Sequence, residues 1–220
     1  MDICRVTEIA VFAKAPVAGY AKTRLIPTLG AAGAARLHRE MTLHAVHVAS
    51  AADIGGVTLW CTPDCQHRFF QALKKSNSFG KPLAFAQQVE GDLGRRMAAV
   101  FALASMQTLL IGSDCPVLSV EHLHQAARAL ADGFDAVFIP AEDGGYTLVG
   151  LRRPAPTIFQ GIAWGSQQVM AQTRERLRQA NLRWLELATL WDVDTAEDVL
   201  RWRALQREEI SSNRRPGDMT

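Results

Sequence analysis

Residues 6–24 read VTEIAVFAKAPVAGYAKTR, an apolar run that breaks into a loop with one proline, one glycine and three cations. The β-branched and aromatic residues at positions 6–12 predict a buried strand, and Pro16 and Gly19 predict that the chain turns after it. Strand-like and helix-like segments then alternate along most of the chain, which predicts an α/β fold with a mostly parallel mixed sheet flanked by helices. Ligands of such sheets bind beyond the carboxyl ends of the strands, so the loop after the first strand is a candidate site.

The other elements follow from apolar periodicity and from the turn residues at their ends. Further strands are expected at residues 57–61, 83–87, 108–111, 135–139, 146–151 and 182–187. Helices are expected at residues 31–51, 66–75, 94–105, 120–131 and 165–180, and a last one runs from Thr195 toward Leu205. Only the turn at 140–145 separates two of the strands, which are either neighbours in the sheet or joined by a wide loop.

Length and composition restrict the class of protein. The chain has 220 residues, of which 48% are hydrophobic and 21% are charged, a balance typical of a globular domain. We expect one domain over residues 1–206 and a polar, disordered tail over 207–220. The net charge of +2, with dispersed basic residues, argues against a nucleic-acid partner. The apolar run at 9–13 is short for a signal peptide and no stretch approaches a membrane span, so we expect a cytoplasmic protein.

The first loop carries the residues that best suit a nucleotide. Cations and free backbone amides in one loop suit a polyphosphate, because arginine offers a planar fork and lysine a point charge. The candidate nucleotide-binding residues of this loop are Lys14, Gly19, Lys22, Thr23 and Arg24. A second glycine loop, containing Gly91 and Asp92, leads into a helix whose amides can receive an anion. A solvated basic loop and an ordinary helix start are the alternatives for these two segments.

Three aspartates are candidate ligands for a divalent metal. Asp114 follows the strand with the strongest signature of burial, and Asp192 and Asp194 come just before the last helix. Carboxylates at the carboxyl ends of strands can hold Mg²⁺ or Mn²⁺ against nucleotide phosphates. Alternatively, Asp114 caps the turn before Pro116, and Asp194 or Thr195 caps the last helix. We favour Asp194 over Asp192 as the second ligand.

Glu142 and Asp143 are the candidate catalytic residues. They precede Gly144 and Gly145, and glycines in a loop let a backbone amide approach a ligand. A carboxylate in this place can accept the proton of a hydroxyl group and act as a general base. The same residues would also make an ordinary turn, so both interpretations stay open.

Taken in order, these motifs resemble those of the nucleotide-diphospho-sugar transferase superfamily, which has a GT-A-type, Rossmann-like fold. More closely, the chain resembles a bacterial family named as glycosyltransferases, long catalogued as a domain of unknown function and linked by name to radical-SAM or arsenosugar gene neighbourhoods. The likeness covers about residues 9–200 and rests on residues 12–16 (FAKAP), Gly19 with 22–25 (KTRL), 91–94 (GDLG), 112–116 (GSDCP), 143–146 (DGGY) and 192–195 (DVDT). It implies that the first loop binds the nucleotide, that Asp114 takes the place of the metal-binding acid, and that the later loops receive a second substrate.

The resemblance implies a metal-dependent transferase, and we favour transfer of a sugar from a nucleotide-sugar to a small-molecule acceptor. Residues 22–24 and 192–195 also resemble those of nucleotidyltransferases such as phospholactate guanylyltransferase, so transfer of a nucleotide to a phosphorylated small molecule is the alternative. The chain departs from the usual Asp-x-Asp of glycosyltransferases, because residues 113–115 contain one acid, Asp114. That departure keeps open a third interpretation, a module that binds a nucleotide without turning it over.

Overall fold

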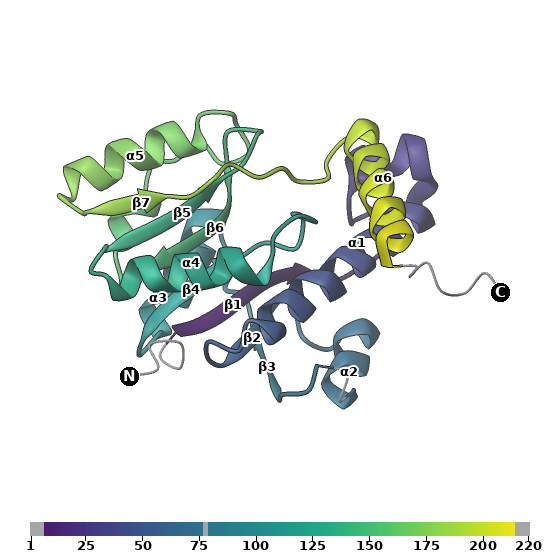
Figure 1. Cartoon of the computed structure of the whole chain (residues 1–220), viewed down its shortest axis with the longest axis horizontal. Coiled ribbons are helices and arrows are strands. Elements are labelled where there is room, and N and C mark those ends of the chain that lie inside the picture. The colour runs from purple at the N-terminus through teal and green to yellow at the C-terminus, as the bar shows by residue number, and fades with distance from the viewer. Residues whose placement is uncertain (1–6, 77–78, 214–220) are drawn as a thin grey trace.

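The computed structural model describes residues 7–76 and 79–213, which form a seven-stranded sheet covered by helices on both faces (Figure 1). The strands are β1 (Thr7–Lys14), β2 (Val57–Thr62), β3 (Leu83–Gln87), β4 (Gln107–Ile111), β5 (Ala136–Pro140), β6 (Tyr146–Leu151) and β7 (Trp184–Glu186). The helices are α1 (Ile26–Ala51), α2 (Arg68–Lys75), α3 (Leu93–Leu103), α4 (Val120–Ala131), α5 (Val169–Gln179) and α6 (Ala196–Asn213), with 3-10 turns η2 (Thr23–Leu25) and η3 (Pro156–Phe159). The predicted α/β class is confirmed.

The strand order is β3-β2-β1-β4-β6-β5-β7. Every pairing is parallel except those of β6, which runs antiparallel between β4 and β5. β2 and β3 follow on one side of β1, and β4 then pairs with the other side of β1. The loops that follow β1 and β4 therefore diverge at the carboxyl edge of the sheet, which is where α/β sheets form binding sites. The tight turn after β5 makes β5 and β6 neighbours, the first of the two arrangements that the sequence leaves open.

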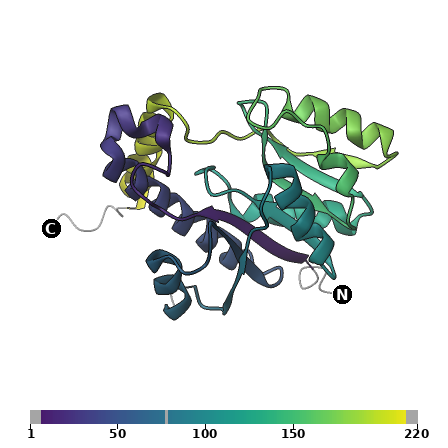
Figure 2. The same ribbon diagram turned by 180° about the vertical axis from the view of Figure 1, so that it is seen from behind.

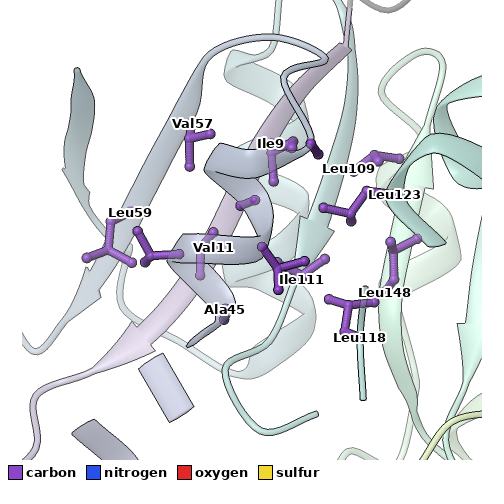
Figure 3. Packing of buried hydrophobic residues seen from close by; sticks show 14 of the residues in the cluster. Ile9, Val11, Ala45, Val57, Leu59, Leu109, Ile111, Leu118, Leu123 and Leu148 are labelled. Carbon is purple, nitrogen blue, oxygen red and sulfur yellow. The ribbon is translucent and has the colours of Figure 1, made fainter. Parts of the chain in front are cut away.

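Alternating side chains along β1 supply both faces of the sheet. Ile9, Val11 and Ala13 belong to a buried cluster with α1, α2 and α4, while Ala10 and Phe12 belong to the opposite face with α3, η3 and α5. Figure 3 shows the first cluster, in which side chains of β1, β2 and β4 face those of the covering helices. Because strands buried on both faces need apolar residues at successive positions, the near-continuous apolar runs of β1 and β4 match their central places.

A third, smaller cluster joins the C-terminal helix to the first one. An extended segment after β7 leads to α6, which lies beside the N-terminal half of α1 (Figures 1 and 2). Trp191 and Trp202 pack there with Leu37 of α1. Thr195 caps α6, because its hydroxyl oxygen accepts a hydrogen bond from the Asp198 amide at 3.3 Å. The segment that carries two of the candidate metal ligands is therefore anchored at both ends.

Some helix boundaries differ from the sequence-based expectation. α1 begins at Ile26 with a short turn, and a kink at Gly30, whose φ of 69° is not helical, separates this turn from the expected helix. α6 continues to Asn213, past the expected domain boundary at residue 206, and residues 214–220 of the expected tail lie outside the described residues. None of the described helices is both long and apolar enough to cross a bilayer.

Candidate functional site

A cleft of about 560 Å³ opens beyond the carboxyl ends of β1 and β4. Its walls come from the loop after β1, the loop after β4, the β5–β6 turn and the segment before α6. These segments bring together eight of the predicted site residues: Lys14, Lys22, Thr23, Arg24, Asp114, Asp143, Asp192 and Asp194. The cleft lies at the change of strand order, which is the place that this topology favours for a ligand.

The other four predicted residues do not line the cleft. Gly19 has a φ of +85° and lets the first loop turn, and Gly91 has a φ of +123°. Asp92 caps α3, because its carboxylate accepts a hydrogen bond at 2.8 Å from an amide in the first turn of that helix. Glu142 forms an ion pair with Arg201 at 2.9 Å. Turn, cap and ion-pair roles therefore account for these four residues locally.

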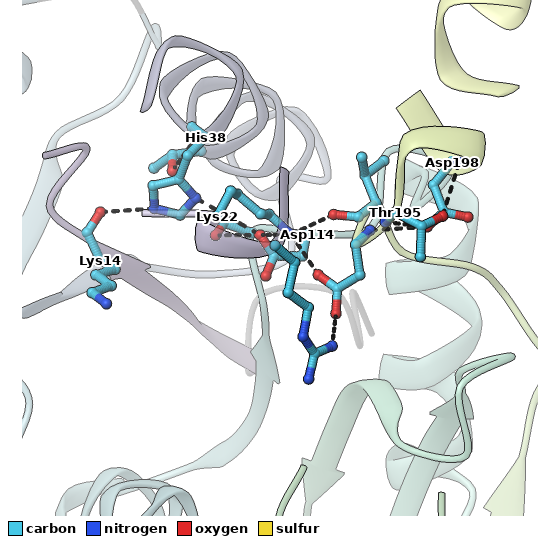
Figure 4. Close-up of polar contacts among 11 residues, drawn as sticks. Lys14, Lys22, His38, Asp114, Thr195 and Asp198 are labelled. Carbon is cyan, nitrogen blue, oxygen red and sulfur yellow. Dashed lines mark hydrogen bonds and ion pairs between the residues drawn. The ribbon is translucent and has the colours of Figure 1, made fainter. Parts of the chain in front are cut away.

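Lys22 links the first loop to the segment before α6 (Figure 4). Its ammonium group lies 3.1 Å from Asp114 Oδ1 and 3.0 Å from Asp194 Oδ1, and it donates to the Val193 carbonyl at 2.6 Å. Arg24 contacts the other oxygen of Asp194 at 3.1 Å. These contacts close one end of the cleft with a network of opposite charges.

Burial and backbone geometry set Lys22 apart from an ordinary surface lysine. Only 6% of its side chain is exposed, and its φ of 48° and ψ of 49° are left-handed, a conformation that costs free energy for residues other than glycine. Burial alone would lower the pKa of Lys22, but the charges of Asp114 and Asp194 outweigh it and raise the pKa above its ordinary value. The carboxylates therefore hold a cation in this strained position.

Asp114 has a second neighbour in His38, a buried residue of α1. His38 Nδ1 lies 3.8 Å from Asp114 Oδ1, and His38 Nε2 lies 2.9 Å from the Lys14 carbonyl. Because a carbonyl oxygen only accepts hydrogen bonds, Nε2 carries a proton. Desolvation would raise the pKa of Asp114, but His38 and Lys22 together outweigh it and lower the pKa to about 2. Asp114 is thus ionised at neutral pH.

Asp192 is the most crowded carboxylate of the cleft. Burial, followed by the negative charges of Asp143, Asp194 and Asp114, raises the pKa of Asp192 to about 7. The positive charge of Lys22 acts in the opposite direction. A group of carboxylates that repel one another in this way is typical of a functional site, because a bound cation or proton relieves the repulsion.

The β5–β6 turn presents Asp143 to the cleft. Its Oδ1 atom accepts a hydrogen bond from the Gly145 amide at 2.8 Å. Gly144 has a φ of +89°, and a Cβ atom there would lie 2.2 Å from the Gln167 carbonyl oxygen. The Gly144 carbonyl accepts a hydrogen bond from the Met170 amide at 2.8 Å. Since only glycine fits this close approach, the glycine after Asp143 fixes the turn against the start of α5.

The arrangement of the carboxylates around Lys22 limits how the predicted metal ion could bind. Within residues 7–76 and 79–213, no group of three or more His, Cys, Asp or Glu side chains is arranged to hold a metal ion. The Lys22 ammonium contacts both Asp114 and Asp194, so a divalent ion that bound both carboxylates would have to displace it. The donors themselves, carboxylates that repel one another, are those that Mg²⁺ and Mn²⁺ prefer.

Sequence reasoning missed several residues of the cleft. Those with polar or aromatic side chains include His38, Gln88, Arg96 and Trp164. A polar residue on the core-facing side of a predicted helix is the signal that marks His38. No local pattern marks Trp164, which reaches the cleft by packing edge-on against Tyr146 with ring centroids 6.4 Å apart.

The fold, with its cleft at the change of strand order, is that of the nucleotide-diphospho-sugar transferase superfamily. Within it, the chain belongs to the bacterial family described as "Uncharacterized protein conserved in bacteria (DUF2064)", whose model matches residues 44–166. A crystal structure from Desulfovibrio desulfuricans G20, described as a "putative nucleotide-diphospho-sugar transferase", is 30% identical and has a TM-score of 0.77. The match covers 93% of this chain and 95% of that one. The family and fold that the motifs indicate are confirmed.

More distant structures share the fold alone. One is 4-diphosphocytidyl-2C-methyl-D-erythritol synthase from Anaerococcus prevotii DSM 20548, at 11% identity and a TM-score of 0.61, with 93% of this chain and 99% of that chain covered. Another is CMP:2-keto-3-deoxy-manno-octonic acid synthetase in complex with CTP, at 14% identity and a TM-score of 0.57, with the same coverage of 93% and 99%. A search of curated protein sequences gave no match.

Proposed function

We propose that this protein is a nucleotide-using transferase that depends on a divalent metal and moves a sugar from a nucleotide-sugar to a small-molecule acceptor. One observation carries the proposal: cations of the first loop and four carboxylates from three other segments line a single cleft. The relative from Desulfovibrio desulfuricans, by its description, supports the nucleotide-sugar donor. Catalysis in such a site rests on positioning and on charge stabilisation at phosphate oxygens.

The nucleotide half of the proposed site is the first loop. Lys14, Lys22 and Arg24 line the cleft with Thr23, and their cationic groups suit the phosphates of the donor. Arg24 is well suited to reach a ligand, since 73% of its side chain is exposed. Lys22 would exchange its contacts with the carboxylates for contacts with phosphate.

Asp114 and one of the two aspartates before α6, Asp194 in preference to Asp192, would hold Mg²⁺ or Mn²⁺. A hard divalent ion commonly takes one or two protein carboxylates and completes its shell with phosphate oxygens and water. Such an ion, when bound, stabilises the negative charge that develops on the leaving phosphate group. Relief of the repulsion around Asp192 would favour its binding.

The acceptor half of the proposed site is Asp143. Its Oδ1 atom is engaged by the Gly145 amide, whereas Oδ2 has no hydrogen-bond partner in the part of the chain that the structure describes. A carboxylate oxygen in this position can take the proton of an attacking hydroxyl group. Glu142 is less suited to this role, because Arg201 holds it outside the cleft lining.

Nucleotidyl transfer is the second candidate reaction. Three cations from the end of β1 and the loop after it reach the cleft, and this density of positive charge also suits a triphosphate. Here a phosphate group of the second substrate would attack the nucleotide, and pyrophosphate would leave. No hydroxyl proton would then have to be removed, so Asp143 would matter much less than Lys14, Lys22 and Arg24.

Product analysis separates these reactions. The protein would be screened by thermal shift against nucleoside triphosphates and nucleotide-sugars with and without Mn²⁺, because a ligand of the folded state raises its stability. The stabilising nucleotides would then be incubated with a mixture of small hydroxylated and phosphorylated acceptors. A released nucleoside diphosphate indicates glycosyl transfer, and pyrophosphate indicates nucleotidyl transfer. Binding without turnover of any donor would leave a nucleotide-binding module and contradict both reactions.

The metal has its own test. We expect EDTA to remove turnover and Asp114→Asn to abolish most of it, because an amide is a poorer ligand for a hard cation than a carboxylate. Mn²⁺ binding, measured by electron paramagnetic resonance, should weaken in the same variant. Asp132→Asn, at an exposed position after α4, is the matched control and should change neither quantity. Full turnover in excess EDTA would end the metal proposal.

A further inference from the structure

A second groove, of about 490 Å³, borders Pro16 and Ala18 of the first loop. It runs between the first loop, α1 and the start of α2, two helices that cover the same face of the sheet (Figure 1). Its lining residues are Pro16, Ala18, Ala32, Ala35, Arg36, Arg39, His67, Arg68, Phe69 and Ala72. None of these residues lines the cleft, although Pro16 and Ala18 belong to the loop that carries Lys22.

Three arginines of this groove have no acidic partner in the part of the chain that the structure describes. Arg36 and Arg39 are three residues apart on α1 and share one side of it, and Arg68 begins α2. All three are exposed. The acids nearest in sequence, Glu40 and Asp64, form no ion pair with them within residues 7–76 and 79–213. Like charges gathered without compensation repel one another, and an anion would relieve that repulsion.

The rest of the groove is built for an apolar or flat group. Small side chains of α1, α2 and the first loop line it, and the ring of Phe69 lies 5.9 Å from the Arg39 guanidinium. This contact over an aromatic face limits the positions of Arg39. Guanidinium forks bind phosphate and carboxylate oxygens in pairs. Small apolar side chains beside exposed guanidinium groups suit a ligand that joins an apolar or flat part to an anionic group.

We propose that the groove is a second binding site, for a small phosphate ester whose organic part is apolar or flat. Three guanidinium groups favour an anion with more than one negative charge over a single carboxylate. The site does not depend on the reaction catalysed in the cleft. Because the first loop borders both cavities, a ligand in the groove would contact the same segment that holds Lys22 and Arg24.

Phenyl phosphate is a suitable probe, with benzoate as the singly charged comparison and benzyl alcohol as the neutral one. Binding would be measured by isothermal titration calorimetry in phosphate-free buffer at pH 8, without metal. The variants are Arg36→Gln/Arg39→Gln, Arg68→Gln, the cleft variant Arg24→Ala, and Arg203→Gln as an exposed control on α6. Since every substituted side chain is exposed, circular dichroism should show the same fold in all of them.

We expect phenyl phosphate to bind more tightly than benzoate and benzyl alcohol to show no binding. The double variant should lose about a hundredfold in affinity and Arg68→Gln about tenfold, as for the loss of charge-assisted hydrogen bonds. Arg203→Gln should bind as the natural protein does, and Arg24→Ala, which removes a cation of the cleft and none of the groove, should lose much less affinity than the double variant. Unchanged affinity in the double variant, an equal loss in Arg24→Ala, or benzoate binding as tight as phenyl phosphate would each overturn the proposal.

Discussion

Asp192 and Asp135 lie at opposite ends of the strands of one sheet, and their surroundings shift their pKa values in opposite directions. Asp135 comes just before β5 and receives hydrogen bonds from the Arg183 amide at 3.0 Å and from Arg152 at 2.9 Å. The Arg183 amide, followed by Arg152, lowers the pKa of Asp135. Asp192 lies beyond the carboxyl ends of the strands, where burial and then its acidic neighbours, led by Asp143, raise its pKa to about 7.

The difference is between an aspartate whose ionised form stabilises the fold and one whose ionised form destabilises it. At the amino ends of the strands, hydrogen bonds from Arg183 and Arg152 match the negative charge of Asp135, so its ionised form stabilises the folded state. Beyond the carboxyl ends of the strands, Asp192 is buried among other carboxylates and only partly matched by Lys22, so its ionised form costs stability. A bound cation or proton would relieve this cost. Substitutions at the two ends of the strands should therefore affect different properties of the protein.

The largest expected effect is on turnover and comes from Asp143→Asn at the crowded edge. If Asp143 takes the proton of the acceptor, turnover should fall by about 10² to 10⁴, the usual contribution of a general base. Nucleotide affinity should stay nearly unchanged, because the variant keeps the shape of the turn. The measurements are kcat with a working acceptor and the Kd of the donor by calorimetry.

Glu142→Gln is the matched control, since this neighbour pairs with Arg201 instead of lining the cleft. It should keep most of its turnover. If Asp143→Asn instead loses donor affinity while the bound complex still reacts, Asp143 belongs to the donor half of the site.

The next effect is on binding and compares Lys22→Ala with Arg24→Ala. Each should weaken nucleotide binding by about ten to a hundredfold, since each removes a charge-assisted hydrogen bond worth roughly 1.5 to 3 kcal/mol. Calorimetry with the stabilising nucleotide measures both. Unchanged affinity in both variants would remove the first loop from the site.

The same pair of variants should differ in metal binding without nucleotide. Lys22→Ala removes the ammonium group that contacts Asp114 and Asp194. Mn²⁺ then has no cation to displace and should bind this variant more tightly than the natural protein. Arg24→Ala removes only an exposed contact to one of them and should have a smaller effect. Weaker Mn²⁺ binding in Lys22→Ala would contradict the displacement.

The smallest effects are on stability and have opposite signs at the two edges. The folded pKa of Asp135 lies below its ordinary value of 3.8, so the interaction stabilises above that pH and is lost as the pH falls through the folded pKa. Asp135→Asn should therefore lower the melting temperature at pH 8 by about 2 to 4 °C, for a loss of about 1 kcal/mol, with a smaller difference at pH 3.

For Asp192, the stability of the fold should change with pH in the opposite direction. Its folded pKa of about 7 lies above its ordinary value of 3.8, so the folded state binds the proton more tightly and stability falls as the pH rises between these values. Asp192→Asn should melt higher than the natural protein at pH 8 in EDTA, and the difference should vanish near pH 3.5. Calorimetric melting curves check both variants. A lower melting temperature for Asp192→Asn than for the natural protein at pH 8 would show that the charge of Asp192 does not destabilise the fold.

Much of the fold and part of the site could be predicted from the sequence, because strands, helix starts and tight turns depend on near neighbours. The apolar run at residues 9–13 and the glycines after Asp143 are local signals, and the strand and the turn that they indicate are present. The carboxyl ends of parallel strands meet at one edge for topological reasons. For that reason the loops after β1, β4 and β5 could be expected to share a cleft.

The remaining features depend on how distant segments meet. The sequence determined by itself that residue 22 is a lysine in a loop after a buried strand, but only the tertiary structure brought its ammonium group to Asp194, 172 positions later. The same holds for His38, which reaches Asp114 because α1 packs against the sheet beside the loop after β4. Such contacts arise from strand order and helix packing, and these are decided by burial of apolar surface over the whole chain.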